Sequence, residues 1–197
     1  MDSWLRSPPP DQIDAGSVRL RRWRPEDAEA LTRLVSDNLE HLRRWMPWAQ
    51  QQPTLDSQRA FISRMQKEWE DFTNFGYAIT LPTGELIGGI GLHTRQGMGT
   101  LEIGYWIAEP HTRRGYATAA SRVLAQTGLA FTGVEAVEIR CDEGNGASVA
   151  IPRRLGFRLV SRNVGREIQA PAETGRWMVW AARRGEWPPI AAGRQSP

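Results

Sequence analysis

Two arginines, a glycine and a small residue follow one another in the segment Thr112-Arg113-Arg114-Gly115-Tyr116-Ala117-Thr118, between a predicted strand and a predicted helix. The first N–H groups of a helix lack internal partners and attract anions. Gly115 and Ala117 would leave that backbone open to phosphate oxygens, and Arg113 and Arg114 would add positive charge. The pattern predicts a phosphate-binding loop, and a plain strand-to-helix turn with two solvated arginines is the alternative.

A second segment, Asn145-Gly146-Ala147-Ser148, opens a short predicted helix that ends in Arg154-Leu155-Gly156-Phe157. Asn145 suits the N-cap position, where its side chain can accept a hydrogen bond from the first turn. Gly156 suits the left-handed turn that ends many helices. The segment therefore places two hydrogen-bonding side chains, Asn145 and Ser148, directly after a predicted strand.

The composition is that of a globular chain of one domain. Its 197 residues are 40% hydrophobic and 24% charged, and Cys141 is the single cysteine. This length buries a core without disulfides. No stretch approaches the roughly 20 apolar residues that span a bilayer, and the first residues lack the order of a signal peptide. We expect a cytoplasmic protein with no membrane contact.

The small excess of basic over acidic residues does not by itself identify a binding partner. A net charge of +3 comes from 25 basic and 22 acidic residues that are interspersed along the chain. A nucleic-acid-binding module would need a continuous basic face, so this class is the less favoured alternative. A ligand with several phosphates also suits a basic protein. No Gly-x-Gly-x-x-Gly opens the first strand–helix unit, which disfavours a hydride-transfer enzyme.

Hydrophobic periodicity predicts a mixed α/β fold. Three consecutive strands with tight turns indicate an antiparallel meander, and the strand–helix–strand segment over 100–140 requires a parallel pair. Residues 1–16, with Pro8-Pro9-Pro10, predict a flexible arm before a domain over 17–183 and a tail over 184–197. The predicted strands are 18–21, 76–81, 86–92, 100–107, 136–140, 157–163 and 177–182, and the predicted helices are about 25–35, 55–72, 116–131 and 145–155.

Taken together, the two segments resemble the acyl-CoA N-acyltransferase (GNAT) superfamily. The loop pattern there is Gln or Arg, two residues, Gly, one residue, then Gly or Ala, and this chain departs from it only at Thr112. Three runs resemble the ribosomal-protein-alanine (Rim-type) branch. They are Glu102-Ile103-Gly104-Tyr105-Trp106-Ile107, Gly115-Tyr116-Ala117-Thr118 and Leu42-Arg43-Arg44-Trp45-Met46-Pro47-Trp48.

This resemblance, which covers residues 17 to 183, implies a fold and a cosubstrate. The fold is a mixed, mostly antiparallel seven-stranded sheet with a central splayed parallel pair and flanking helices. Acetyl-CoA would lie in the splay, and no metal is implied. The implied cofactor-binding residues are Tyr105, Trp106, Ile107, Arg113, Arg114, Gly115, Tyr116, Ala117, Thr118, Asn145 and Arg154.

The implied reaction is direct attack by a primary amine on the thioester in a ternary complex. Glu102 matches a glutamate that serves as general base in the superfamily, often through water, and a strand carboxylate without catalytic duty is the alternative. Many members carry a tyrosine as thiolate acid where this chain has Pro152. Ser148 is therefore the expected acid, or a structural hydrogen-bonding residue at a helix start.

The acceptor is the least determined part of the prediction. Trp45 and Trp48, on either side of Pro47, are expected to cover an acceptor groove that contains Glu102, or else to be core aromatics. The acceptor is a protein or peptide N-terminus, with a small-molecule amine such as an antibiotic or aminoacyl derivative as the alternative. A monomer and a homodimer both remain open. His41, His93 and His111 lack metal-ligand spacing, and Cys141 suits a small buried residue better than a nucleophile.

Overall fold

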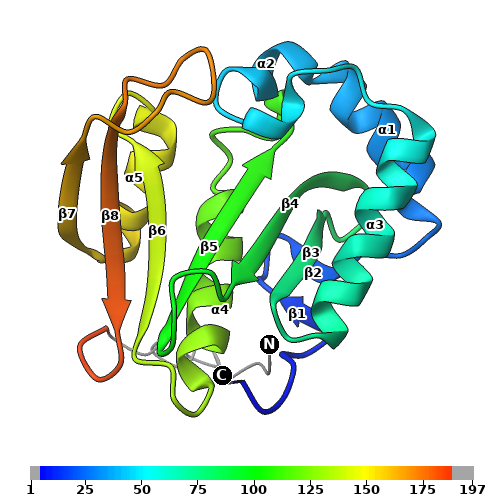
Figure 1. Cartoon of the computed structure of the whole chain (residues 1–197). Helices are drawn as coiled ribbons and strands as arrows, with labels where there is room; N and C mark the ends of the chain where they lie inside the picture. The colour runs from blue at the N-terminus through cyan, green and yellow to red at the C-terminus, as the bar shows by residue number, and fades with distance from the viewer. Residues whose placement is uncertain (1–4, 188–197) are drawn as a thin grey trace, which may run out of the picture.

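The computed structural model describes residues 5–187, whose strands form one open eight-stranded sheet (Figure 1). The strand order is β1-β2-β3-β4-β5-β6-β8-β7, and only β5 and β6 are parallel neighbours. The mixed, mostly antiparallel sheet predicted from the sequence is confirmed. The strands are β1 (Gln12–Asp14), β2 (Arg19–Arg22), β3 (Asn74–Thr80), β4 (Leu86–His93), β5 (Thr100–Ile107), β6 (Ala136–Asp142), β7 (Arg158–Val164) and β8 (Arg176–Arg183).

The predicted count of seven strands is wrong by one, because β1 lies inside the segment expected to be a flexible arm. Ile13 of β1 pairs with Leu20 of β2 and packs against the core. The Tyr77 hydroxyl donates a hydrogen bond of 2.9 Å to the Pro10 carbonyl, which holds the preceding residues against the sheet. A strand of three residues is too short for its alternation to stand out in a sequence. Residues 1–4 and 188–197 lie outside the described part of the chain.

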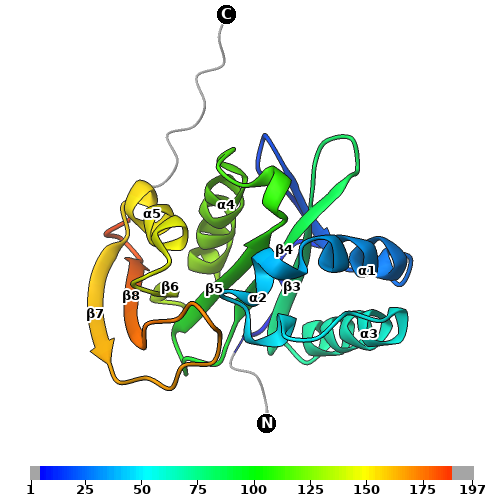
Figure 2. The ribbon, with the colours of Figure 1, turned by 90° about the horizontal axis from the view of Figure 1, so that it is seen from above.

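The helices cover both faces of the sheet (Figure 2). α4 and α5 pack on one face, where Leu124 of α4 joins Leu101 and Ile103 of β5 in the larger core cluster. α1 and α3 pack on the other face, where Leu31 and Ile62 join the second cluster. The helices are α1 (Asp27–Asp37), α2 (Leu39–Arg43), α3 (Leu55–Glu70), α4 (Tyr116–Ala130) and α5 (Gly146–Leu155), with 3₁₀ turns η1 (Pro47–Ala49) and η2 (Glu109–His111).

Local sequence explains most helix boundaries. The Thr54 hydroxyl accepts the Ser57 N–H at 3.1 Å, which forms a capping box at the start of α3. Asn145 caps α5 by accepting the Ser148 N–H at 3.0 Å, and Gly156 ends that helix with φ of +75°, both as predicted. The helix α2 was not predicted, since five residues give too little periodic signal.

The parallel pair β5–β6 separates part-way along its length. Thr100–Ile103 pair with Ala136–Ile139, but Gly104–Ile107 pair only with β4 and Arg140–Asp142 only with β8. In Figure 1 the two strands diverge toward the end that carries α2. The splay implied by the family resemblance is therefore confirmed, and the β6-facing backbone edge of Gly104–Ile107 has no strand partner.

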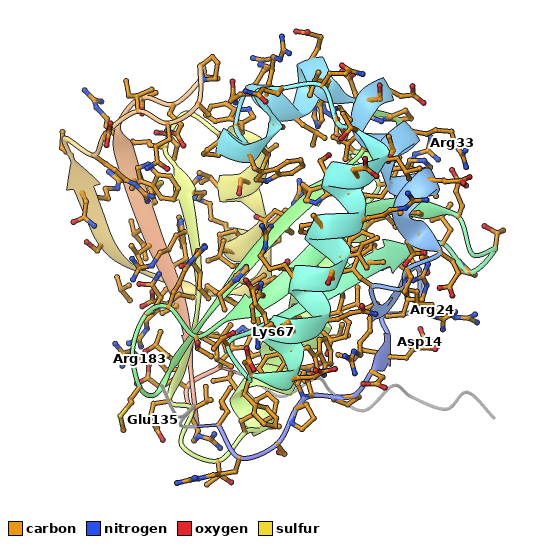
Figure 3. The ribbon with its side chains drawn as sticks, turned by 45° about the vertical axis from the view of Figure 1, so that its right-hand side comes forward. Asp14, Arg24, Arg33, Lys67, Glu135 and Arg183 are labelled. Carbon is orange, nitrogen blue, oxygen red and sulfur yellow. The ribbon has the colours of Figure 1, made fainter. Side chains whose placement is uncertain are left out.

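Charged side chains of both signs lie on the outside of the molecule. Figure 3 labels Asp14, Arg24, Arg33, Glu135 and Arg183, which project from separate parts of the surface. No described helix is long and apolar enough to cross a membrane. After β8 the chain turns back onto the core, where the Trp187 indole donates a 2.7 Å hydrogen bond to the Leu155 carbonyl. The start of the expected tail is therefore packed.

Candidate active site

One groove of about 1290 Å³ crosses the sheet at the splay. On one face it is bounded by the segment between α2 and α3 and by side chains of α3. At the splay it reaches the start of α5 on the opposite face. Seven of the predicted site residues line this groove, namely Trp45, Trp48, Glu102, Tyr105, Trp106, Asn145 and Ser148.

The predicted phosphate loop leads directly into the first turn of α4. Gly115 has φ of +82°, which directs the chain into α4, and a Cβ there would have no heavy atom within 4 Å. No side chain caps α4, and no acidic residue lies in its first turn. The N–H groups of Tyr116, Ala117 and Thr118 have no partner within the helix. A positive helix end with free donors favours the binding of an anion.

Glu102 is buried, with 5% of its surface exposed, and it is already paired. Both carboxylate oxygens accept from the Arg95 guanidinium, and Oε2 also accepts from the Gln96 amide. The guanidinium of Arg140 lies 4.0 Å from Oε2. Burial alone would raise the pKa of Glu102, but the hydrogen bond and charge of Arg95, with Gln96, lower it overall. These hydrogen bonds stabilise the ionised carboxylate and make it a weaker proton acceptor.

Ser148 lies at the point where the groove meets α5. Its hydroxyl is 2.8 Å from the Tyr105 hydroxyl, on the strand that leaves the parallel pair. Burial raises the pKa of Tyr105, against a smaller lowering by the Ser148 hydrogen bond. The sequence prediction gave Tyr105 only backbone contacts, whereas its side chain adds a second hydroxyl beside Ser148. Because 43 positions separate the two residues, no local pattern could have indicated this contact.

Comparison with known proteins identifies the family. A family model described as an acetyltransferase (GNAT) domain matches residues 17–158. The chain belongs to the GNAT acetyltransferase family. It is 32% identical over 142 residues to YdaF of Bacillus subtilis, covering 71% of this chain and 77% of YdaF, a protein named as a ribosomal N-acetyltransferase. Members of this family carry out acyl transfer that depends on acyl-CoA.

Two solved structures place this GNAT domain among known relatives. Mycobacterium smegmatis RimJ, in complex with CoA-disulfide, has a TM-score of 0.78 and 25% identity over 94% of this chain and 91% of RimJ. The microcin C7 self-immunity acetyltransferase MccE, in complex with acetyl-CoA and AMP, has a TM-score of 0.80 over 88% of this chain and 97% of MccE. Its identity of 20% supports the shared fold alone.

Some predicted cofactor residues lie outside the large groove of this GNAT domain. Ile107, which is 8% exposed, and the loop residues 113–118 do not line it. Arg154 lines a separate cavity of about 440 Å³ beside α5, together with Arg153 and Glu143. Glu102 and Ser148, the residues predicted to take part in the reaction, therefore line one groove, whereas the residues predicted to bind phosphate lie outside it.

The segment Trp45–Trp48 lines the same groove as Glu102. Trp48 is 52% exposed, and its ring meets that of Trp106 edge-on at 5.8 Å between centroids. A Cβ on Gly144, next to the start of α5, would be 3.4 Å from the Trp45 ring, so Trp45 reaches toward the far side of the splay. The Ala172 N–H donates to the Arg44 carbonyl at 3.0 Å, which ties this segment to the β7–β8 loop.

Sequence reasoning missed four polar residues of this site. Asn74, His93, Arg95 and Arg140 all line the groove, and none stood in a motif. The only signal in the sequence was that each of them lies near the end of a strand. Such a signal cannot show which strand ends come together in the fold. Cys141 also lines the groove, but burial raises its pKa to about 11, which leaves it a poor nucleophile. Within residues 5–187, no group of three His, Cys, Asp or Glu side chains could hold a metal.

Proposed function

We propose that this protein is an N-acetyltransferase that moves the acetyl group of acetyl-CoA to a primary amine, most favourably a protein or peptide N-terminus. The groove that crosses the sheet at the β5–β6 splay carries this proposal. It joins the face that holds Glu102 and the tryptophans to the face that holds Ser148. Both substrates can therefore be held at once, and transfer is direct within a ternary complex.

The residues that would hold acetyl-CoA offer hydrogen-bond donors and positive charges that suit it. The open first turn of α4, with Arg113 and Arg114 before it, suits the pyrophosphate. The unpaired backbone edge of Gly104–Ile107 suits the amides of the pantetheine arm, as does the remaining amide N–H₂ of Asn145. Arg154 is assigned to the outer phosphate or adenosine. When bound, acetyl-CoA supplies an activated thioester at the splay.

Glu102 and Ser148 stand on opposite sides of that position. We assign Ser148, supported by the Tyr105 hydroxyl, to proton delivery at the departing sulfur. The base role of Glu102 stays a prediction. Its pairing with Arg95 and Gln96 limits both its attraction for a cationic amino group and its use as a proton acceptor.

The choice of acceptor rests on the relatives and on the state of the groove carboxylates. YdaF is named for a ribosomal substrate, and the RimJ structure shares the fold. A cationic small molecule would need unpaired acidic side chains. Each described carboxylate of the groove already has a partner within the protein: Glu68 has Asn74, Glu102 has Arg95, Asp142 has Thr174, and Glu173 has the Gln169 backbone. The small-molecule amine remains the second candidate.

A thiol-release assay with acetyl-CoA against N-terminal peptides and small amines tests the proposal. We expect release that depends on the amine and is fastest with a peptide N-terminus. Thermal-shift titration should show saturable stabilisation by acetyl-CoA that acetyl-pantetheine, which lacks the phosphates, reproduces poorly. Absence of both stabilisation and amine-dependent release would refute the assignment. Release only with small amines would move the acceptor to the second candidate.

A further inference from the structure

Three polar side chains form a row across the acceptor face of the sheet. The register places Asn74 of β3 opposite His93 of β4, and His93 opposite Glu102 of β5. All three line the groove. Because side chains alternate between faces along each strand, the row projects from one face, opposite to Leu92, Leu101 and Ile103.

The next row on the same face consists of glycines. Gly76, Gly91 and Gly104 stand opposite one another on β3, β4 and β5. A Cβ on Gly104 would come within 3.1 Å of the His93 Nε2, and a Cβ on Gly91 within 3.5 Å of it. The edge of the imidazole therefore lies over this row of glycines, which forms a floor of the groove without side chains. Gly104 is also the first β5 residue beyond the parallel pairing, so this floor ends at the splay.

Two acceptor atoms in this row lack partners within residues 5–187. The Asn74 Oδ1 is buried and receives no hydrogen bond, although the amide nitrogen of Asn74 donates to Glu68 at 2.7 Å. A Cβ on Gly91 would be 3.3 Å from that oxygen, which places Oδ1 at the same floor as the imidazole. His93 forms no hydrogen bond with a described residue. A buried atom without a partner, such as the Asn74 Oδ1, is costly, and a ligand donor would relieve that cost.

We propose that Asn74 and His93 receive the acceptor's amino group in its neutral form, and that His93 takes the proton lost when the nitrogen attacks the thioester. This inference rests on the proposed transfer to an amine. The nitrogen bonds to the acetyl carbon, the carbon–sulfur bond breaks toward sulfur, and the proton moves from nitrogen to Nε2. The sulfur is protonated by water or by Ser148, which regains its proton from solvent, and the imidazole returns its proton to solvent.

The electrostatics of the row agree with a neutral imidazole. Burial, and to a smaller extent the charge of Arg95, lower the pKa of His93 to about 4 against the opposite effect of Glu102. The other charges near this row are paired: Glu68 of α3 with Asn74 and Arg64, and Arg140 of β6 with Glu138. An α-amino group has a pKa of about 7.7–8.0, so roughly a tenth of it or more is neutral at pH 7. When the amine nitrogen attacks the thioester, its N–H becomes acidic. A weakly basic imidazole is therefore sufficient to take the proton.

Substitution of His93 tests the proposal with the best amine found in the thiol-release assay. His93→Ala should lower kcat/KM for the amine by about 10²–10³-fold, within the range of general-base effects, with acetyl-CoA affinity within twofold of wild type. Added imidazole should restore part of the rate in a saturable way. His93→Gln should hold the amine better than alanine but not recover kcat. His41→Gln, at a histidine outside the groove, is the matched control.

Two further measurements separate this inference from the function itself. Gly91→Ala, whose methyl group would lie 3.3 Å from the Asn74 Oδ1 and 3.5 Å from the His93 Nε2, should lower the rate while acetyl-CoA affinity is kept. An NMR titration of the imidazole signals, assigned with His93→Gln, needs no acceptor and should show His93 neutral down to about pH 5. A His93→Ala rate within twofold of wild type, loss without imidazole rescue, or a charged His93 at pH 7 would overturn the inference. An inactive wild type with a neutral His93 would refute the amine transfer alone.

Discussion

Replacement of Gly115 separates the charge of the phosphate site from its backbone geometry. The residue has φ of +82° directly before α4, and a Cβ there meets no other atom within 4 Å. Alanine therefore introduces left-handed strain of about 1–2 kcal/mol and no clash. Glutamate introduces the same strain and one negative charge. The pair Gly115→Ala and Gly115→Glu thus differs mainly in charge.

The negative charge that Gly115→Glu introduces should stabilise the fold relative to Gly115→Ala, but it should weaken the binding of acetyl-CoA. Near the helix start, a carboxylate stabilises the fold by about 0.3–1 kcal/mol, so Gly115→Glu should melt no lower than Gly115→Ala. Both variants should melt about 2–8 °C below wild type for a chain of this size. Against a phosphate charge about 5 Å away, the same carboxylate costs between about 0.8 and 3.3 kcal/mol, depending on the local dielectric. Acetyl-CoA affinity should therefore fall by about 4- to 300-fold relative to Gly115→Ala.

Isothermal titration calorimetry with acetyl-CoA and acetyl-pantetheine measures this difference. Acetyl-pantetheine should bind the two variants equally, because it lacks the phosphates. Added salt should shrink the difference for acetyl-CoA, since it screens exposed charges. Equal acetyl-CoA affinity of two folded variants would refute the placement of the pyrophosphate at α4.

Three other outcomes follow from the site. Glu102→Gln should lower kcat/KM by roughly tenfold if His93 is the base, whereas a loss of about 10²–10⁴-fold with recovery at high pH would support Glu102 as the base. Ser148→Ala should lower kcat at unchanged acetyl-CoA affinity and without recovery at high pH, and Tyr105→Phe should lower it less; the reverse order in steady-state assays would make Tyr105 the acid. The pKa of about 4 for His93, against 6.5 for a free imidazole, means that the unfolded chain binds an extra proton between these values. The free energy of unfolding should therefore fall as pH drops from 6.5 toward 4, by up to about 1.4 kcal/mol per pH unit, and His93→Gln should remove that part of the slope in denaturant titrations.

Local signals in the sequence predicted the elements well, because their causes are local. Asn145 and Gly156 bound α5 as expected, since a cap and a left-handed turn depend on the residues within one helical turn. Gly115 before α4 follows the same logic. The short elements β1 and α2 were missed because three or five residues carry too little periodicity to be distinguished from loop.

The family therefore followed from the sequence itself, together with the prediction of a phosphate loop over residues 112–118 and the expectation, from the family resemblance, that Glu102 and Ser148 share one site. The tertiary structure alone decided what surrounds them. The Arg95 guanidinium donates hydrogen bonds to the carboxylate of Glu102, and the Tyr105 hydroxyl lies within hydrogen-bond distance of the Ser148 hydroxyl. Asn74 and His93 share a row with Glu102 only because three strands pair in one register. Alternation along a strand fixes which side chains share a face, but hydrogen bonds between distant segments fix which residues stand opposite one another.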